Sequence, residues 1–311
     1  MKDRQEIEGL TTEIALSAYR DYIDPVLIAR TNGVGGKLAI AAEMDRYDTI
    51  GRDCVAVCMN DLAAAGAKPL FFHDNISCVR PKAERIADLE KGLKAGCDEY
   101  GVAFSGSELM ELPETFGNHQ YDVVGFAVGI LDRSRHVRKT EFREGDVIMG
   151  LASNGLHNNG YVAAKKKLFL SKETMEIYYE NLGGTLGDLL MQPTKCYLSA
   201  MEAIGSAQIE VKSCIQVAHG GLDTALRNLL DGKGAVIKQL PQSIPPIYNL
   251  LHRDGNIPLE QLRGICNMGI GMLFVVSEDD EARIIDLMEE VGEESVPLGL
   301  IEAKSKEIRY I

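Results

Sequence analysis

Strand-like and helix-like segments alternate along most of this chain, and this alternation is the feature that most limits its fold. Helical periodicity is present at residues 50–66, 82–100, 160–170, 220–231 and 279–291. Short apolar runs with strand character lie at residues 25–31, 69–76, 102–105, 121–131, 146–152, 269–276 and 296–302. The pattern predicts helices packed on sheets, in an α/β or mixed α+β fold.

The length of the chain indicates two domains. Its 311 residues are enough for two units of ordinary size. The charged stretch at 132–146 is the best candidate for a linker between them. We therefore predict an N-terminal domain at residues 1–138 and a C-terminal domain at residues 139–311.

Composition and charge exclude several classes of protein. The net charge of −13 argues against a nucleic-acid-binding protein, whose phosphate contacts need a cationic face. No window approaches the ~20 apolar residues of a membrane span, and the N-terminus lacks a secretory apolar region. The 7 cysteines are odd in number and scattered, as expected for free thiols. We expect a cytoplasmic protein that binds neither nucleic acid nor membrane.

A glycine-rich loop follows the first apolar run. The sequence Thr31-Asn-Gly-Val-Gly-Gly-Lys37 places backbone N–H groups and an ammonium after a strand, an arrangement that binds phosphates. The spacing matches neither the P-loop nor the dinucleotide fingerprint. A tight turn explains the glycines about equally well. The candidate phosphate-binding residues are Asn32, Gly33, Val34, Gly35, Gly36 and Lys37.

The segment 50–66 carries an acid on an apolar helix face. Asp61 lies three residues after Cys58 and four after Val57, in the middle of that face. An unpaired buried carboxylate is costly, so a cation or hydrogen-bond donors must meet it. One interpretation is a divalent-metal ligand with Asn60 beside it. The alternative is an aspartate that serves as a helix cap or forms a salt bridge.

Two further acids are weaker candidates. Asp122 stands near the start of an otherwise apolar strand, and Glu108 follows the strand-like segment 102–105. Asp122 at a strand end is consistent with a ligand site or with a turn cap. A solvated loop explains Glu108 nearly as well.

Donor groups cluster at the predicted starts of two helices. His157 is the imidazole best placed to contact a phosphate or relay a proton, although an isolated histidine is usually structural. His219 with its glycine pair opens the segment 220–231 in the same way. The candidate residues for binding substrate or phosphate are Ser153, Asn154, Gly155, His157, Asn159, His219, Gly220 and Gly221.

Taken together, these motifs resemble the phosphoribosylformylglycinamidine cyclo-ligase family, also called aminoimidazole ribonucleotide synthetase. The resemblance covers roughly residues 22–302. It rests on Thr31-Asn-Gly-Val-Gly-Gly-Lys37, Asp48-Thr-Ile-Gly51, Cys58-Met-Asn-Asp-Leu62, Gly66-Ala-Lys-Pro-Leu-Phe-Phe-His-Asp74, Tyr121-Asp-Val-Val-Gly125, Ser153-Asn-Gly-Leu-His-Asn-Asn-Gly-Tyr161, Pro193-Thr-Lys-Cys-Tyr197 and Cys266-Asn-Met-Gly-Ile-Gly271.

The resemblance implies a two-domain enzyme that uses ATP and Mg²⁺ in purine biosynthesis. Its substrate is formylglycinamidine ribonucleotide, whose ring closure gives aminoimidazole ribonucleotide. It also implies that Asp61 with Asn60 holds the metal, that Lys37 and its loop hold the phosphates, and that His157 serves the phosphate or substrate side. We assign the catalytic roles to Asp61, Lys37 and His157.

The resemblance also implies a homodimer joined through the N-terminal domains. Segment 121–131 supports it, because a strand apolar on both faces at an open sheet edge invites pairing.

Some positions depart from the family pattern. Asn32 stands where the family has Asp, and Gly36 stands where the family has Thr. His219 lies within an element that is glycine-rich in the family. At position 32 the family's carboxylate ligates a cation, whereas the amide offers only a neutral oxygen to the metal. The alternative function is a paralogue of the same superfamily that binds a nucleotide without catalysis or acts on another substrate.

Overall fold

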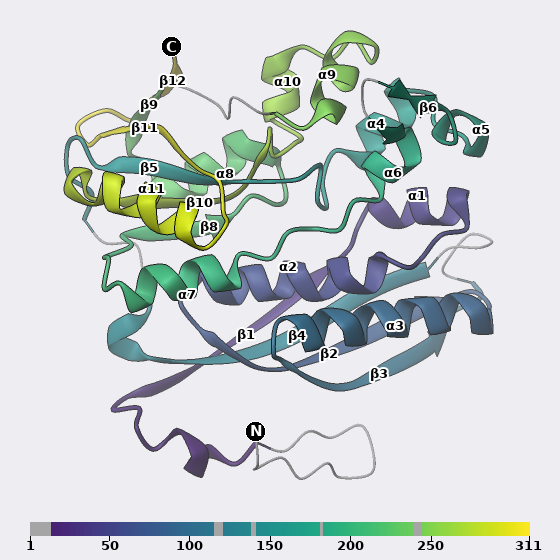
Figure 1. Ribbon diagram of the computed structural model, residues 1–311, viewed down its shortest axis with the longest axis horizontal. Coiled ribbons are helices and arrows are strands. Elements are labelled where there is room, and N and C mark those ends of the chain that lie inside the picture. The colour runs from purple at the N-terminus through teal and green to yellow at the C-terminus, as the bar shows by residue number, and fades with distance from the viewer. Residues whose placement is uncertain (1–13, 115–120, 138–140, 181–182, 239–243) are drawn as a thin grey trace.

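The computed structural model describes residues 14–114, 121–137, 141–180, 183–238 and 244–311. It contains a four-stranded sheet in the first half of the chain and a six-stranded sheet in the second, each with helices packed on it (Figure 1). The predicted mixed α/β fold with two sheet-containing domains is confirmed. The expected boundary after residue 138 falls in a segment outside the described residues.

The first domain is a sheet of order β1-β4-β2-β3. Strand β4 is antiparallel to β1 and β2, and β2 is parallel to β3 through a helical crossover. Its elements are β1 (Pro25–Gly33), α1 (Lys37–Met44), α2 (Ile50–Ala64), β2 (Lys68–Cys78), α3 (Ala83–Glu99), β3 (Ala103–Glu111) and β4 (Tyr121–Asp132).

The sequence argument for an open edge at segment 121–131 was wrong. β4 lies in the middle of the sheet, where β1 and β2 flank it. Val123 and Ala127 are buried on the face that α2 and α3 cover, and Val128 and Ile130 pack on the other face with Tyr22, whereas Phe126 on that face is exposed. The edge strands of this sheet are β1 and β3.

Helices α2 and α3 cover one face of the first sheet (Figure 1). They approach closely at Gly51, where a Cβ atom would lie 2.3 Å from the backbone of Leu89 and Leu93. Phe72 and Ile76 of β2 point to this face and are buried. The helix pair therefore fixes which side chains of β1 and β2 face inward.

The second domain is a sheet of order β12-β9-β11-β5-β10-β8. All neighbours are antiparallel except β12 and β9. Its elements are β5 (Val147–Ala152), α4 (Tyr161–Lys167), α5 (Lys172–Met175), β6 (Tyr178–Tyr179), β7 (Gly184–Thr185), α6 (Leu186–Leu190), α7 (Leu198–Ser206), β8 (Ser213–Gln216), α8 (Gly221–Leu230), β9 (Gly234–Ile237), α9 (Pro246–Arg253), α10 (Leu259–Arg263), β10 (Ile270–Val276), α11 (Glu281–Glu290), β11 (Ser295–Glu302) and β12 (Ile308–Tyr310).

Strand β10 is buried along its whole length because both faces of this sheet are covered. Phe274 packs in a cluster with residues of α7 and α11, whereas Leu273 packs with residues of α8. A continuous apolar run is the expected sequence of such a strand.

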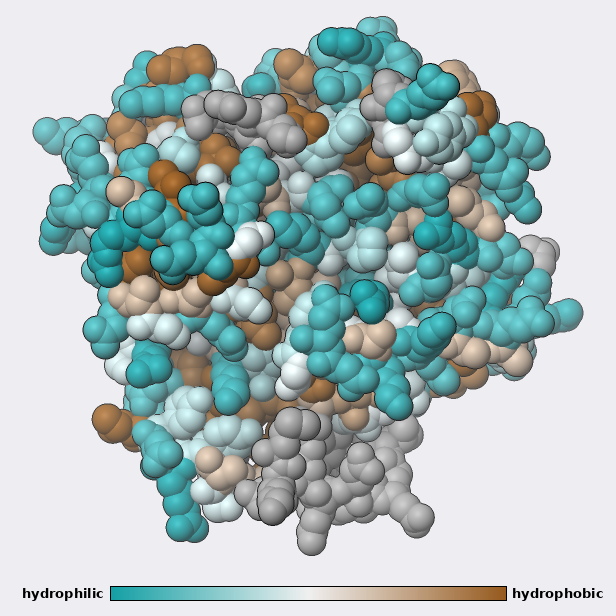
Figure 2. Space-filling view, viewed as in Figure 1, coloured by the Kyte–Doolittle hydropathy of each residue, from teal (hydrophilic) through white to brown (hydrophobic). Residues whose placement is uncertain are grey.

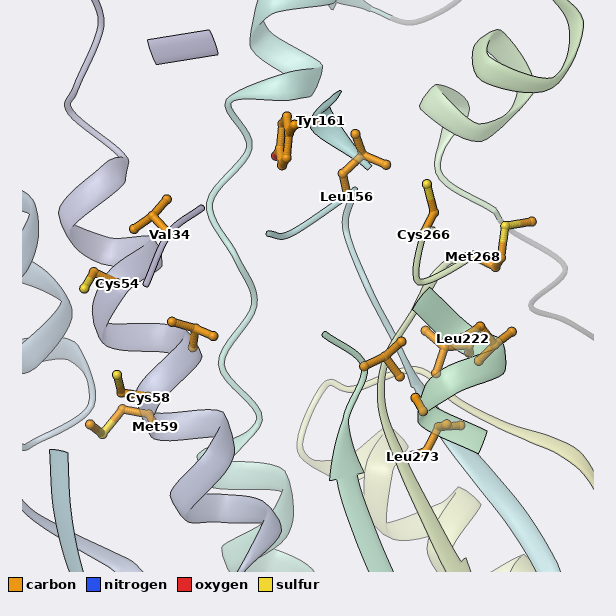
Figure 3. Packing of buried hydrophobic residues seen from close by; sticks show 14 of the residues in the cluster. Val34, Cys54, Cys58, Met59, Leu156, Tyr161, Leu222, Cys266, Met268 and Leu273 are labelled. Carbon is orange, nitrogen blue, oxygen red and sulfur yellow. The ribbon is translucent and has the colours of Figure 1, made fainter. Parts of the chain in front are cut away.

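The two domains share one hydrophobic core. Helix α2 contacts the first sheet on one side and α7 and β8 of the second domain on the other. Figure 3 shows the buried cluster extending from Val34 and Cys58 through Tyr161 to Leu222. On the surface in Figure 2, hydrophilic residues cover most of the area between small hydrophobic patches. Among the described residues, no helix is both long and apolar enough to cross a membrane.

Candidate active site between the domains

Lys37 forms a buried ion pair in place of an exposed phosphate contact. Its ammonium lies 2.7 Å from Asp53 Oδ2 and donates to the carbonyl of Gln192 at 2.5 Å. Both charged side chains are 0% exposed. Burial lowers the pKa of Lys37 and raises that of Asp53, and the attraction between the two charges opposes both shifts. The ammonium of Lys37 is thus bound by Asp53 and Gln192 in this structure, and its role as a phosphate ligand stays a prediction.

The segment 192–197 passes between the domains and is held by polar side chains from both. Lys37 binds Gln192, and Asp53 accepts from the backbone N–H of Thr194 at 2.6 Å and from its hydroxyl at 2.7 Å. Asn154 donates to the carbonyl of Pro193 at 2.9 Å. We call residues 192–197 the interdomain segment.

Asn60 also binds the interdomain segment. Its amide nitrogen donates to the carbonyl of Lys195 at 2.8 Å, and its oxygen accepts from the N–H of Tyr197 at 2.8 Å. The side chain is fully buried. Both ends of the amide are engaged by backbone, so Asn60 joins the two domains in this structure, and its role as a metal ligand stays a prediction.

Asp61 lies beside Asn60 on α2 and faces a different set of donors. Its Oδ2 accepts from the amide of Asn32 at 3.2 Å, and its Oδ1 accepts from the amide of Gln216 at 3.1 Å. Burial raises the pKa of Asp61, and the hydrogen bond from Asn32 and the charge of Arg30 oppose this shift. The carboxylate is therefore partly buried and held by one amide from each domain.

Asn32 presents its nitrogen to this carboxylate, and its oxygen accepts from the N–H of Gly33 at 3.0 Å. This is the reverse of the orientation expected for a metal ligand, in which the carbonyl oxygen would face the cation. Gly33, Val34, Gly35 and Gly36 then lead into α1, and Gly35 adopts a φ of 67°.

His157 is a buried neutral side chain. Its Nε2 lies 2.9 Å from Asn154 Oδ1, which accepts because the amide nitrogen of Asn154 donates to Pro193. Burial, with Lys37 and Lys195 nearby, lowers the pKa of His157 to about 3. The ring is uncharged at neutral pH. The geometry gives His157 the role of orienting Asn154 and bears against a cationic phosphate contact.

The loop after β5 is fixed by Asn267. Its Nδ2 donates to the carbonyl of Gly155 at 2.9 Å, and its Oδ1 lies 3.0 Å from the hydroxyl of Ser153 and 2.5 Å from that of Tyr248. Asn267 is fully buried. Asn154 is exposed and Asn159 is half-buried at the far end of this loop.

His219 and Gly220 are exposed at the start of α8, and Gly221 is buried. The charge of His219 lowers the pKa of Asp61, which places the two side chains in the same region. The glycines adopt φ values of 81° and 66°. His219 therefore lies exposed at the start of α8, two residues after the end of the segment that carries Gln216 and Val217.

The other two acids lie away from this group. Asp122 pairs in register with Ser77, and Glu108 with Asn75. Side chains alternate along a strand, so both acids share the face opposite α2, whereas Asp74 and Ile76 point toward the helices and are buried. Within one chain, Asp122 and Glu108 do not reach Asp61.

Among the residues that the structure describes, no group of three or more His, Cys, Asp or Glu side chains converges as a metal site. Asp61 is a single carboxylate with amides around it. Mg²⁺ commonly binds one or two carboxylates together with the phosphates of its substrate. The residues present therefore fit a Mg²⁺–nucleotide complex held by Asp61, with the phosphates supplying the other ligands.

Comparison with known proteins identifies the family of this chain. The family model "AIR synthase related protein, N-terminal domain" matches residues 22–131, and the corresponding C-terminal domain model matches residues 143–311. A phosphoribosylformylglycinamidine cyclo-ligase of Lachnoclostridium phytofermentans is 39% identical over 97% of this chain and 89% of its own length. The chain belongs to the phosphoribosylformylglycinamidine cyclo-ligase family. The enzyme of the same name from Geobacillus sp. is 41% identical over 90% of this chain and 81% of its own.

Solved structures outside the family share its fold. Thiamine-monophosphate kinase from Stenotrophomonas maltophilia has a TM-score of 0.70 at 19% identity, covering 93% of this chain and 86% of its own. The hydrogenase maturation protein HypE of E. coli also has a TM-score of 0.70, at 13% identity, covering 96% and 86%. T. maritima PurL complexed with ATP has a TM-score of 0.61 at 16% identity, covering 94% and 42%.

Sequence reasoning missed Asp53, Gln216 and Asn267. Asp53 carried a usable signal, because it is an acid in the first turn of a helix whose residues are mostly apolar. Asn267 lies within a motif that supports the family resemblance. Gln216 carried no signal, because its partner is 155 residues away along the chain.

Proposed function

We propose that this chain catalyses the ATP-dependent ring closure of formylglycinamidine ribonucleotide to aminoimidazole ribonucleotide in purine biosynthesis. The observation that carries the proposal is the similarity to cyclo-ligases over nearly the full length of both domains. The contacts of Asp61 with Asn32 of the first domain and Gln216 of the second support it.

The reaction needs a phosphoryl donor and a way to close the ring. Transfer of the γ-phosphoryl group to the amide oxygen of the substrate makes the attached carbon electrophilic. The amidine nitrogen then attacks that carbon, and inorganic phosphate leaves with the oxygen. Bound Mg²⁺ supplies charge neutralisation at the transferring phosphoryl group.

The residues of the chain bind and orient these reactants. Asp61 would hold Mg²⁺, and the backbone N–H groups of the loop 33–36 would face the phosphates. Lys37 and Asp53 fix that loop against the interdomain segment. Their contribution is positioning, which depends on keeping reacting atoms in a near-attack geometry.

The loop after β5 would bind the ribonucleotide. Ser153, Asn154, Gly155 and Asn159 supply polar groups there, and neutral His157 orients Asn154. At the start of α8, His219, Gly220 and Gly221 would bind a phosphate oxygen.

We also propose that the protein is a homodimer joined through the face of the first sheet that lies opposite α2 and α3. Leu27 is 55% exposed and Phe126 39% exposed on that face, and the rings of Phe126 and Phe71 lie 6.2 Å apart. Asp122 and Glu108 share this face, so a partner would bring them into a second, intersubunit part of the ATP site. Light scattering at micromolar concentration should give twice the 34.0 kDa mass of the chain, and a monomer would contradict the proposal.

We place the enzyme in the cytoplasm, because the structure contains free thiols at all seven cysteine positions.

A turnover assay tests the proposed activity. The wild-type chain is incubated with formylglycinamidine ribonucleotide, ATP and Mg²⁺, and aminoimidazole ribonucleotide, ADP and phosphate are measured. We expect all three products in equal amounts and their loss in Asp61→Ala. Mg²⁺-dependent nucleotide binding without turnover would instead support a nucleotide-binding paralogue, or one that acts on another substrate.

A further inference from the structure

Gln216 connects the second domain to Asp61. It ends β8, the edge strand of the six-stranded sheet, and its side chain is 6% exposed. Its amide nitrogen lies 3.1 Å from Asp61 Oδ1 and 3.2 Å from the carbonyl oxygen of Val57, one turn earlier on α2. A single side chain of the second domain thus binds both the backbone and the carboxylate of this helix.

The contact has a counterpart in the first domain. Asn32 donates to Oδ2 of Asp61 at 3.2 Å, and Gln216 donates to Oδ1. Each carboxylate oxygen has a further lone pair after accepting one hydrogen bond. The two amides therefore fix the plane of the carboxylate and leave it able to bind a cation.

We propose that Gln216 is a positioning residue that orients the carboxylate of Asp61 for a divalent cation bound to nucleotide phosphates. This inference rests on the proposed function of Asp61. Carboxylate ligands are usually held by hydrogen bonds from outer groups, and loss of such a group typically costs about 10–100-fold in metal affinity. Because Gln216 belongs to the second domain, cation binding in the first domain depends on contact between the two.

The experiment measures binding of a non-hydrolysable ATP analogue by calorimetry over a series of Mg²⁺ concentrations. Gln216→Met preserves the size of the side chain and removes the donor. We expect the Mg²⁺ concentration for half-maximal analogue binding to rise about 10–100-fold. The matched control is Gln261→Met on α10, an exposed glutamine that should keep the wild-type value.

A double-mutant cycle with Asp61→Asn separates positioning from a general structural effect. If Gln216 acts through Asp61, Gln216→Met changes the Mg²⁺ requirement in the wild-type background and leaves it unchanged in the Asp61→Asn background. An equal change in both backgrounds overturns the inference. So does a Gln216→Met protein that matches the Gln261→Met control.

A second variant covers the case in which Gln216→Met does not fold. Gln216→Glu keeps the length of the side chain and places a second carboxylate against Asp61. We expect its melting temperature to rise more with Mg²⁺ than that of the wild type, and an equal rise overturns the inference. Failure of the proposed function gives a different result, because Asp61→Asn alone would then leave Mg²⁺-dependent binding unchanged.

Discussion

Replacing Asn32 with aspartate tests the charge balance at the interdomain site. In the structure the amide nitrogen of Asn32 donates to Asp61 Oδ2 at 3.2 Å. Asn32→Asp replaces this donor with a carboxylate oxygen at nearly the same place. The hydrogen bond from Gly33 to the other oxygen is retained. The variant therefore exchanges one attractive contact for a repulsive one and changes little else.

The size of the repulsion follows from Coulomb's law. Two unit charges about 4 Å apart interact by roughly 4 kcal/mol at an effective dielectric of ~20. Asp61 is only partly buried, so solvent and side-chain rotation reduce this value. We expect the unfolding free energy without Mg²⁺ to fall by about 1–3 kcal/mol, which corresponds to a decrease in melting temperature of about 2–6 °C.

Mg²⁺ should reverse the effect. A cation between two carboxylates gains from both charges, whereas in the wild type it meets a single carboxylate and an amide. A gain of only about 1.4 kcal/mol is tenfold in affinity. We expect Asn32→Asp to bind Mg²⁺–ATP several-fold more tightly than the wild type and to recover its melting temperature when Mg²⁺ is added.

The assay combines calorimetric titration of Mg²⁺–ATP with thermal unfolding in the presence and absence of Mg²⁺. Asn228→Asp on the exposed side of α8 is the control for the added negative charge. Unchanged or weaker Mg²⁺–ATP affinity in Asn32→Asp would refute the reasoning, because position 32 would then not face the cation. Turnover measured on the same variant separates a weakened enzyme, which should gain activity, from a nucleotide-binding paralogue, which should not.

Three other changes should have measurable effects. Burial raises the pKa of Asp74 from 3.8 to about 7, so its ionisation lowers the unfolding free energy by at most about 4 kcal/mol as pH rises from about 4 to about 7. Urea unfolding should show that Asp74→Asn removes this pH dependence, and an unchanged pH profile of the variant would contradict the prediction. Lys37→Met should lower the unfolding free energy by about 3–5 kcal/mol, because it leaves the carboxylate of Asp53 unpaired in the interior. The double variant Lys37→Met with Asp53→Asn should recover part of this loss in the same measurement, and equal losses in the single and double variants would rule out the buried charge as the cause. Gly51→Ala should lower the melting temperature by several degrees, because its Cβ would lie 2.3 Å from the backbone of α3. The control is Gly205→Ala, whose Cβ would have nothing within 4 Å, and equal melting temperatures for the two variants would show that α2 and α3 can separate at no cost.

Local patterns were sufficient to predict the elements that carry most of the fold. The apolar runs at 121–131 and 269–276 are strands, and the helical periodicity at 50–66 and 82–100 corresponds to α2 and α3. These predictions succeeded because burial on a sheet or helix face depends on the spacing of neighbouring residues. The family was likewise recognisable, because its motifs are short and occur in a fixed order.

The position of β4 shows where local patterns fail. A strand that is apolar on both faces is consistent with an edge covered by a partner or with the centre of a sheet. Only the pairing of β1 and β2 on either side of it settles the matter. Such pairing joins residues about a hundred positions apart, as Pro25 and Asp132 illustrate.

The sequence by itself determined that α2 carries a chemically unusual acid, since Asp61 interrupts an apolar face. Only the tertiary structure decided how the polar residues of that helix are used. Asp53 and Asn60 bind the interdomain segment, and Asp61 faces the other domain through Gln216. The physical reason is that α2 is enclosed on two sides, by the first sheet and by the second domain. Helical periodicity distinguishes an apolar face from a polar one, but the partner of a buried polar group is set by contacts between segments distant in the chain.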